Sequence, residues 1–272
     1  MTHTAAKIGV IVCSSRKPRA CPQISQFIID TINSLPLRGD RINNTILSLI
    51  DLAEWNLPMF DESDVPSQVH DPTKYDHAHT RAWAQEVLRY DAFIFVVPQY
   101  NWGYPAVVKN AIDYLYHEWK GKAAMVVSYG GHGGGKCNAQ LRQVLCGVNM
   151  IPTATGVELS FPGREFTVKA ARGKNLELDG SGKNPAGVWG GAEREQIAKA
   201  YNELLKIVGA NGLQKAWKSA TMKLGMAKKE ISRKYQKNDQ AAADAHAERR
   251  AGSGSGEERR AAGPSSPEAA EH

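Results

Sequence analysis

Hydrophobic residues along this chain form short continuous runs, separated by segments in which they recur every three or four positions. The continuous runs, typical of buried strands, lie at 7–13, 43–50, 93–97, 123–128 and 151–157. The periodic segments predict helices at 22–35, at 75–89 and at 192–208, together with one helix that begins at 105 and a separate helix that ends at about 148. Five strands that alternate with helices predict an α/β protein, a three-layer sandwich with helices on both faces of a parallel sheet. The segments 51–73 and 160–190 are predicted to be irregular.

The clearest strand–loop–helix unit is the stretch 93–119, FIFVVPQYNWGYPAVVKNAIDYLYHEW. The strand stops at Pro98, and Pro105 suits a first helical position because its missing N–H would have no partner there. The loop between them carries Gln99, Tyr100, Asn101, Trp102 and Tyr104. Loops at the carboxyl ends of strands bind ligands in open α/β sheets, so we expect this loop to wall the pocket of a flat, aromatic ligand.

The first strand ends in a polar, basic turn, SSRKPR at 14–19, before a helix. Serine hydroxyls, arginine side chains and free N–H groups at a helix start together favour an anion. An arginine offers two-pronged hydrogen bonding to a phosphate. We therefore interpret this turn as a phosphate site, with a solvated turn as the plain alternative.

The fourth strand ends in a glycine-rich loop, YGGHGGGK at 129–136. Glycines let the backbone approach a ligand closely. Gly130, Gly135 and Lys136 also fit the phosphate-loop pattern G-x-x-x-x-G-K, but Cys137 stands where a Ser or Thr should hold magnesium. A phosphate-loop NTPase is therefore the competing interpretation of this loop.

The expected strand order places the three loops together. With right-handed crossovers, five strands usually adopt the order 2-1-3-4-5. Strands one, three and four are then neighbours, and the phosphate turn, the aromatic loop and the glycine loop meet at one edge of the sheet. This arrangement suits a mononucleotide that bears a flat ring.

Composition separates a domain, 1–212, from a tail, 213–272. With 272 residues and 42% hydrophobic residues, the chain can bury one core of ordinary size. From residue 214 onward there are 12 Lys and Arg against 8 Asp and Glu, so most of the net charge of +6 belongs to the tail. The domain is nearly balanced, and we predict no specific nucleic-acid binding. The segment 214–240 suits a basic amphipathic helix for an acidic partner, with a solvated extension as the favoured alternative, and disorder is predicted from 241.

The cysteines, Cys13, Cys21, Cys137 and Cys146, lack paired metal-ligand spacing, and no signal peptide precedes them. We expect reduced thiols in a cytoplasmic protein, with a nuclear location as the alternative. No apolar run reaches the ~20 residues of a membrane span. Three histidines in the second loop and the helix after it, His70, His77 and His79, match no helix or hairpin face, and a metal site there is disfavoured.

The motifs together resemble the NADPH-dependent FMN reductase family of flavodoxin-like proteins, and most of all its fungal NAD(P)H:quinone reductases that hold FMN. The resemblance runs from about 7 to 157, and less clearly to 208. Its carriers are Ser14-x-Arg16-x-x-Arg19, Asp51-Leu52 with Leu57-Pro58, PQYNWGYPAVVKNAIDYLYHEW at 98–119 and VSYGGHGG at 127–134. Two departures stand out: Cys13 where the family often has Gly, and Gln99 where it often has Glu.

The resemblance implies a set of residues around FMN. Ser14, Arg16 and Arg19 would hold the phosphate. The segment 98–101 would contact the ring through backbone N–H groups, at Pro98, Gln99, Tyr100 and Asn101. The other edge of the ring would lie against Ser128, Tyr129, Gly130 and Gly131.

The implied chemistry belongs to FMN, with no catalytic acid or base required. NAD(P)H would be the co-substrate and a quinone or similar small molecule the acceptor, in a ping-pong cycle. Trp102 and Tyr104 would line the substrate pocket, and His132 would hydrogen-bond an acceptor oxygen. Two other classes remain open: a flavodoxin-type electron carrier, which the near-neutral domain disfavours, and a redox-sensing flavin-binding partner protein. We also expect a homodimer, because Tyr114, Tyr116 and Trp119 lie partly off the packing stripe of their helix.

Overall fold

The structure is a computed structural model that describes residues 5–35, 45–178, 188–210, 220–221 and 225. The chain divides into two units, 1–222 and 223–272. Nearly all of the predicted tail, 213–272, lies outside the described residues, so its predicted helix, disorder and acidic partner stay predictions. Within the described ranges, no helix is both long and apolar enough to cross a membrane.

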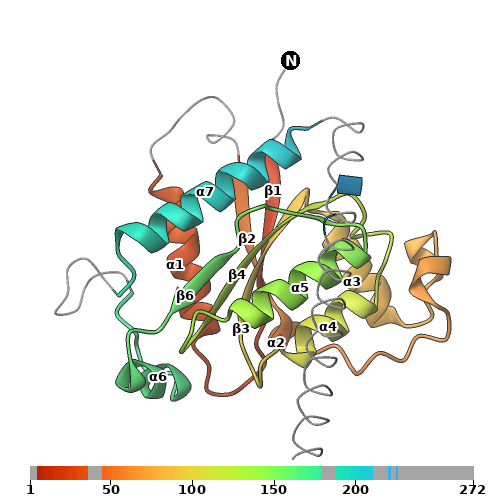
Figure 1. Ribbon diagram of the computed structural model, residues 1–272. Helices are drawn as coiled ribbons and strands as arrows, with labels where there is room; N and C mark the ends of the chain where they lie inside the picture. The colour runs from red at the N-terminus through yellow and green to blue at the C-terminus, as the bar shows by residue number, and fades with distance from the viewer. Residues whose placement is uncertain (1–4, 36–44, 179–187, 211–219, 222–224, 226–272) are drawn as a thin grey trace, which may run out of the picture. The chain divides into compact units, whose positions relative to one another are not determined.

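A parallel sheet forms the middle layer of the first unit (Figure 1). Its order is β2-β1-β3-β4-β5, with β6 also paired to β4, which confirms the predicted order of the flavodoxin-like fold. The strands are β1 (Ala6–Val12), β2 (Thr45–Asp51), β3 (Ala92–Pro98), β4 (Ala123–Gly130), β5 (Ile151–Pro152) and β6 (Val157–Ser160). Because all pairs are parallel, the loops after β1, β3 and β4 leave from the same edge.

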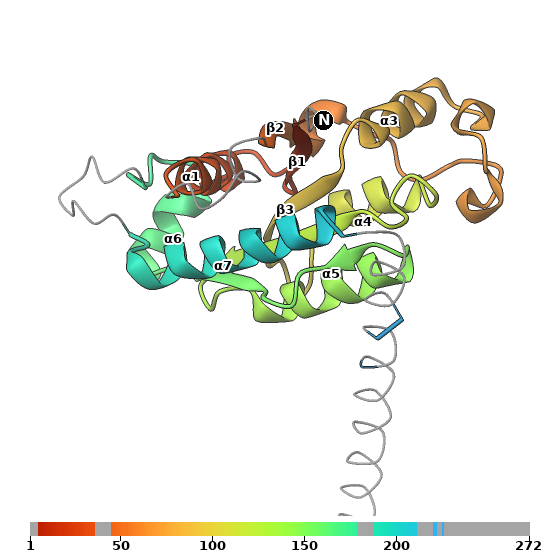
Figure 2. The same ribbon diagram turned by 90° about the horizontal axis from the view of Figure 1, so that it is seen from above.

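Helices cover both faces of the sheet (Figures 1 and 2). On one face lie α1 (Cys21–Asn33) and α7 (Gly191–Val208), and on the other α3 (Ala78–Leu88), α4 (Ala106–Asp113) and α5 (Gly135–Gly147). Strand β3 shows why: Ile94 and Val96 join the core under α1 and α7, whereas Phe93 and Phe95 join the core under α3, α4 and α5. Every residue of β3 is buried, as expected for a central parallel strand.

Helix α4 begins one residue later than predicted. Pro105 is its N-cap, with an extended backbone of φ −63° and ψ 148°, and the helix ends at Asp113. Tyr114 and Trp119, the residues on which the dimer prediction rested, are fully buried in the core under α3, α4 and α5. The reason given for a dimer is therefore wrong at these two positions, because their rings pack within the chain itself.

The predicted fifth strand is two strands, β5 and β6, separated by four residues. The Thr153 N–H still donates to Ala124 O of β4 over 2.8 Å, and the chain leaves the sheet after it because the polar groups of Thr155 have another partner. The N–H and hydroxyl of Thr155 both donate to the Glu203 carboxylate of α7, over 2.8 and 2.7 Å. The chain then returns to β4 at Val157.

The two segments predicted as irregular contain short helices. The first holds α2 (Leu52–Trp55) and two 3-10 turns, Pro66–Gln68 and Pro72–Lys74. The second holds α6 (Arg164–Ala171), so the expectation of an irregular 160–190 is wrong for these residues. Aromatic packing holds α6 on the domain: Phe161 and Phe166 contact Trp189, which is 1% exposed and donates its indole N–H to Ser160 O.

Candidate functional site

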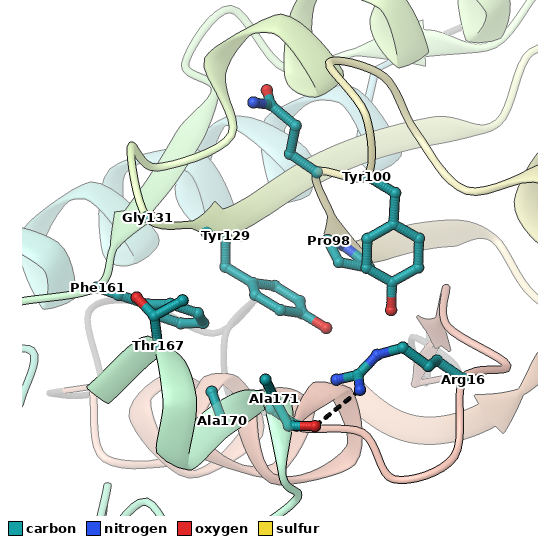
Figure 3. A pocket seen from close by; sticks show the side chains of 12 residues that line it. Arg16, Pro98, Tyr100, Tyr129, Gly131, Phe161, Thr167, Ala170 and Ala171 are labelled. Atoms are coloured by element: carbon teal, nitrogen blue, oxygen red, sulfur yellow. Dashed lines mark hydrogen bonds between the residues drawn. The ribbon is translucent and has the colours of Figure 1, made fainter. Parts of the chain in front are cut away.

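A cavity of about 160 Å³ lies at the carboxyl ends of β3 and β4 (Figure 3). Its walls come from the turn after β1, the loops after β3 and β4, and α6. It is lined by Arg16, Ala20, Pro98, Gln99, Tyr100, Tyr129, Gly130, Gly131, Phe161, Thr167, Ala170 and Ala171. The structure thus brings residues of all three predicted loops to one place.

The turn after β1 places Ser14 and Arg16 in different environments. Ser14 is fully buried, and its hydroxyl shares a hydrogen bond of 2.8 Å with the Tyr100 hydroxyl. Arg16 is exposed and lines the cavity, where its guanidinium donates to Ala171 O over 2.7 Å (Figure 3). Among the described residues, no carboxylate lies within ion-pair distance of Arg16. Its charge therefore remains free to meet an anion.

Arg19, by contrast, is paired with a carboxylate. Its guanidinium makes two hydrogen bonds, of 2.7 and 2.5 Å, to the Asp51 carboxylate, and a third to Ser14 O. Asp51 is 7% exposed and also caps α2 by accepting the Ala53 N–H. The hydrogen bond to Asp51 raises the pKa of the Arg19 guanidinium. In this geometry Arg19 joins the β1 turn to the end of β2, and it does not line the cavity.

The loop after β3 is a tight turn with an unusual backbone. Tyr100 and Gly103 exchange backbone hydrogen bonds of 2.9 and 3.0 Å, and the central residues Asn101 and Trp102 have φ of 45° and 69°. This is the pattern of a type I′ turn, in which positive φ is disfavoured for a residue as large as Trp. Trp102 is 65% exposed, whereas Tyr104 packs against the core. The predicted pair of pocket aromatics is therefore divided between surface and core.

The loop after β4 depends on its glycines. Gly134 has φ 79°, and a Cβ there would lie 3.0 Å from the Cβ of Ser128. Ser128 is buried and donates to Gly133 O, so it shapes the loop from behind. His132 is exposed, and Gly130 and Gly131 line the cavity beside Tyr129.

Sequence reasoning missed the contribution of α6. Thr167, Ala170 and Ala171 line the cavity opposite Pro98 and Tyr129 (Figure 3). The segment carries no motif, and its helical pattern is short. The available signal was Phe161, Phe166 and Trp189, three large aromatic residues in an otherwise polar stretch, which indicates packing on a core.

The cavity fits a phosphate-bearing cofactor with a flat ring. Arg16 supplies an unpaired cation at one side, and the side chains of Tyr100 and Tyr129 point toward that side (Figure 3). At the other side, a Cβ on Gly131 would meet nothing within 4 Å, so the backbone there is open to a ligand.

The thiols near the site are not nucleophiles. Burial raises the pKa of Cys21 to about 12 and that of Cys137 to about 12, and raises the pKa of Cys13 well above its usual range. All four cysteines are buried. Neutral, inaccessible thiols do not attack substrates, so these cysteines are not candidates for a nucleophile.

The histidines weighed for a metal site, His70, His77 and His79, do not line the cavity. His77 and His79 stack on one another, and their Nε2 atoms lie 3.6 and 3.8 Å from Asp61 Oδ1. The His70 ring instead lies against the His117 ring, with centroids 4.3 Å apart and planes tilted by 35°. Within the part of the chain that the structure describes, no group of three or more His, Cys, Asp or Glu residues is arranged to hold a metal ion.

Residues 6–161 match the model of a protein family described as NADPH-dependent FMN reductase. The NAD(P)H-dependent FMN reductase LOT6 of Saccharomyces cerevisiae is 47% identical over 147 residues, which cover 53% of this chain and 75% of the yeast protein. The NAD(P)H-dependent FMN reductase ntnL of Nectria sp. is 33% identical over 205 residues, which cover 75% of this chain and 97% of that protein.

A solved structure shares the fold. The flavoenzyme FerB, an NAD(P)H:(acceptor) oxidoreductase from Paracoccus denitrificans, aligns with a TM-score of 0.50 at 18% identity, over 75% of this chain and 97% of FerB. At this identity the likeness establishes the arrangement of sheet and helices. The family match ends at residue 161, just before α6, so α6 lies outside the matched segment.

Proposed function

This chain belongs to the NADPH-dependent FMN reductase family, and on that basis we propose that it is an FMN-dependent oxidoreductase that oxidises NAD(P)H and reduces a quinone or a related small molecule. The observation that carries the proposal is Arg16, an exposed cation with no carboxylate partner among the described residues, on the wall of a cavity lined by flat side chains and glycine backbone. FMN, when bound, supplies the redox chemistry by accepting a hydride and returning two electrons to the acceptor.

The protein binds and orients the cofactor. Arg16 takes the phosphate by two-pronged hydrogen bonding, and the buried Ser14 hydroxyl, held by Tyr100, supports the turn. Arg19 acts through Asp51, which fixes the turn against the end of β2. The open backbone at Gly130 and Gly131 lets a planar ring lie close to β4.

Cofactor binding requires Arg16 to move. The cavity of about 160 Å³ is smaller than the ~300–1,000 Å³ of usual small-molecule sites, and the bond from Arg16 to Ala171 O closes one side of it. A phosphate is a stronger acceptor than a backbone carbonyl because its hydrogen bond to arginine is assisted by charge. We expect Arg16 to exchange Ala171 O for the phosphate, which widens the cavity on the α6 side.

Substrates would approach from the exposed side of the β3 loop. Trp102 offers a flat surface there, and the His132 ring stands beside the glycine loop for an acceptor oxygen. Because both substrates would use this one approach, the oxidised dinucleotide would leave before the acceptor enters. Initial-rate lines in a two-substrate plot should therefore be parallel, and intersecting lines would contradict the ping-pong order.

The experiment that tests the function is an anaerobic titration of the purified protein with NADPH, followed by a quinone, watched in the visible spectrum. We expect a yellow protein that bleaches with one equivalent of NADPH and recovers its colour with quinone. A colourless protein that binds no added FMN would contradict the proposal. Bleaching by two separate one-electron steps would favour the electron carrier.

The assembly and location of the protein are further proposals. The buried thiols of Cys13, Cys21 and Cys137, which form no disulfide, are consistent with a cytoplasmic protein. Of the three residues behind the dimer prediction, Tyr116 alone is half-buried, and its hydroxyl accepts a 2.7 Å hydrogen bond from Asn149. A homodimer stays a proposal, and a monomeric mass in light scattering would contradict it.

A further inference from the structure

Trp102 has an unfavourable backbone conformation and an exposed side chain. Its φ of 69° lies in the left-handed region, which bulky side chains avoid, and 65% of its surface is exposed. Such strain costs on the order of 1–3 kcal/mol and is commonly kept at functional sites. Neither core packing nor turn geometry explains a Trp here, since a glycine or asparagine would suit the turn better.

A lysine of the glycine loop lies on the Trp102 ring. Lys136 Nζ lies 3.8 Å from the ring centroid, within the range of a cation–π contact. The β3 loop and the first turns of α5 are fastened together at this point: Gln99 Oε1 accepts the Cys137 N–H, and a Cβ on Gly103 would lie 3.0 Å from Gln140 Oε1. Gln99 lines the cavity, so Trp102 and Lys136 lie in segments that are directly joined to the cavity wall.

Lys136 forms no ion pair with a described carboxylate. The side chain is exposed, and no described carboxylate lies within ion-pair distance of it, whereas Lys109 and Lys169 are each paired. The start of α5 is itself unsuited to an anion, because Glu158 Oε2 lies 2.7 Å from where a Cβ of Gly135 would stand. An incoming anion would meet the lysine side chain rather than the helix end.

Two cations that have no carboxylate partner among the described residues thus lie in the segments that follow the carboxyl ends of the strands. Arg16 stands at the β1 side, in the turn proposed for the cofactor phosphate, and Lys136 stands beyond β3 at the α5 side. The proposed reaction needs two phosphate sites, one for the cofactor and one for the dinucleotide. The β1 turn accounts for the first.

We propose that Lys136 binds a phosphate of the nicotinamide dinucleotide, while the exposed face of Trp102 stacks on one of its rings. This inference rests on the proposed function and names the residue that selects the co-substrate. Lysine binds phosphates as a point charge, and an indole ring stacks on planar rings. The cation–π contact holds the lysine in position before the dinucleotide arrives.

The test measures binding of NADP⁺ to the FMN-loaded protein by calorimetry. A charge-assisted hydrogen bond is worth about 10–100-fold in affinity, so Lys136→Gln should raise the Kd for NADP⁺ by at least about tenfold. Lys136→Arg, which keeps the charge and the stacking, should stay within about threefold. The matched control is Lys120→Gln, an equally exposed lysine that precedes β4 at the opposite edge of the sheet.

Comparison of NADP⁺ with NAD⁺ identifies the phosphate. Equal losses for both dinucleotides in Lys136→Gln assign the pyrophosphate, and a loss for NADP⁺ alone assigns the 2′-phosphate. The inference is overturned if Lys136→Gln binds NADP⁺ as tightly as wild type, or if its FMN affinity falls in parallel. A wild-type protein that binds FMN but oxidises neither NADPH nor NADH would instead overturn the proposed function.

Discussion

Replacement of Arg19 separates a structural role from a cofactor-binding role in the β1 turn. Arg19→Met removes both hydrogen bonds to Asp51 and leaves a carboxylate that is 7% exposed without its cation. Loss of one partner from a fully buried pair costs about 3–5 kcal/mol. Arg19 itself is 16% exposed, and Asp51 keeps the Ala53 N–H, so water and the cap compensate in part. We expect a loss of about 2–3 kcal/mol in the free energy of unfolding.

The assay is urea unfolding of the FMN-free protein at pH 7, followed by tryptophan fluorescence, together with FMN affinity from the quenching of flavin fluorescence. The matched control is Arg16→Met, which removes an exposed cation from the same turn. We expect that control to stay within about 0.5 kcal/mol of wild type in stability, since surface substitutions are usually this mild, and to bind FMN at least about tenfold more weakly.

A double-mutant cycle of Arg19→Met with Asp51→Asn isolates the pair, because asparagine preserves the helix cap. The coupling free energy should be about 2 kcal/mol. The reasoning is refuted if Arg19→Met unfolds at the same urea concentration as wild type while its FMN affinity falls as far as that of Arg16→Met. Arg19 would then hold the phosphate directly.

Three further predictions concern the loop, the α6 anchor and the thiols. Gly134→Ala should cost at least about 2 kcal/mol, because its φ is 79° and its Cβ would crowd Ser128, whereas Gly147→Ala, with nothing within 4 Å, should unfold like wild type. Trp189→Phe loses the indole hydrogen bond to Ser160 O, so it should lower the free energy of unfolding by about 1–3 kcal/mol in a thermal unfolding experiment and weaken FMN binding. An unchanged FMN affinity would show that α6 does not contribute to the binding site. Burial raises the pKa of Cys137 from 9.0 to about 12, so the folded state favours the neutral thiol, and stability falls as pH rises from 9. Cys137→Ala should remove about 1 kcal/mol of the loss between pH 9 and 10, because the unfolded thiol is already half ionised at pH 9; equal losses in both proteins would contradict this.

The sequence determined the sheet and the edge at which ligands bind. The β3 run is apolar without alternation, which only a strand buried on both faces requires. Strand–helix alternation with right-handed crossovers then leaves little choice of order, so the turn with Arg16 and the loop with Gly130 had to meet. These are consequences of local pattern and chain connectivity, and both can be read from neighbouring residues.

Contacts between distant residues were decided by the tertiary structure alone. Arg16 and Arg19 are three positions apart and look equivalent in the sequence, yet one lines the cavity and the other pairs with Asp51, 32 residues away. Glu203 on α7 divides the predicted fifth strand by drawing Thr155 out of the sheet. Such partners compete with local preferences, and no local pattern records them.

The contact between Lys136 and Trp102 was also decided by the tertiary structure alone. The sequence showed Lys136 as part of an imperfect phosphate loop and Trp102 as part of an aromatic loop. Only the packing of α5 against β3 brings Lys136 Nζ to 3.8 Å from the centroid of the Trp102 ring. Likewise, the packing of Phe161 against Trp189 holds α6 where its residues line the cavity. The sequence therefore determined which loops form the site, because periodicity sets the strands, and the tertiary structure decided which side chains of those loops face a ligand, because burial and charge pairing are settled only when distant segments meet.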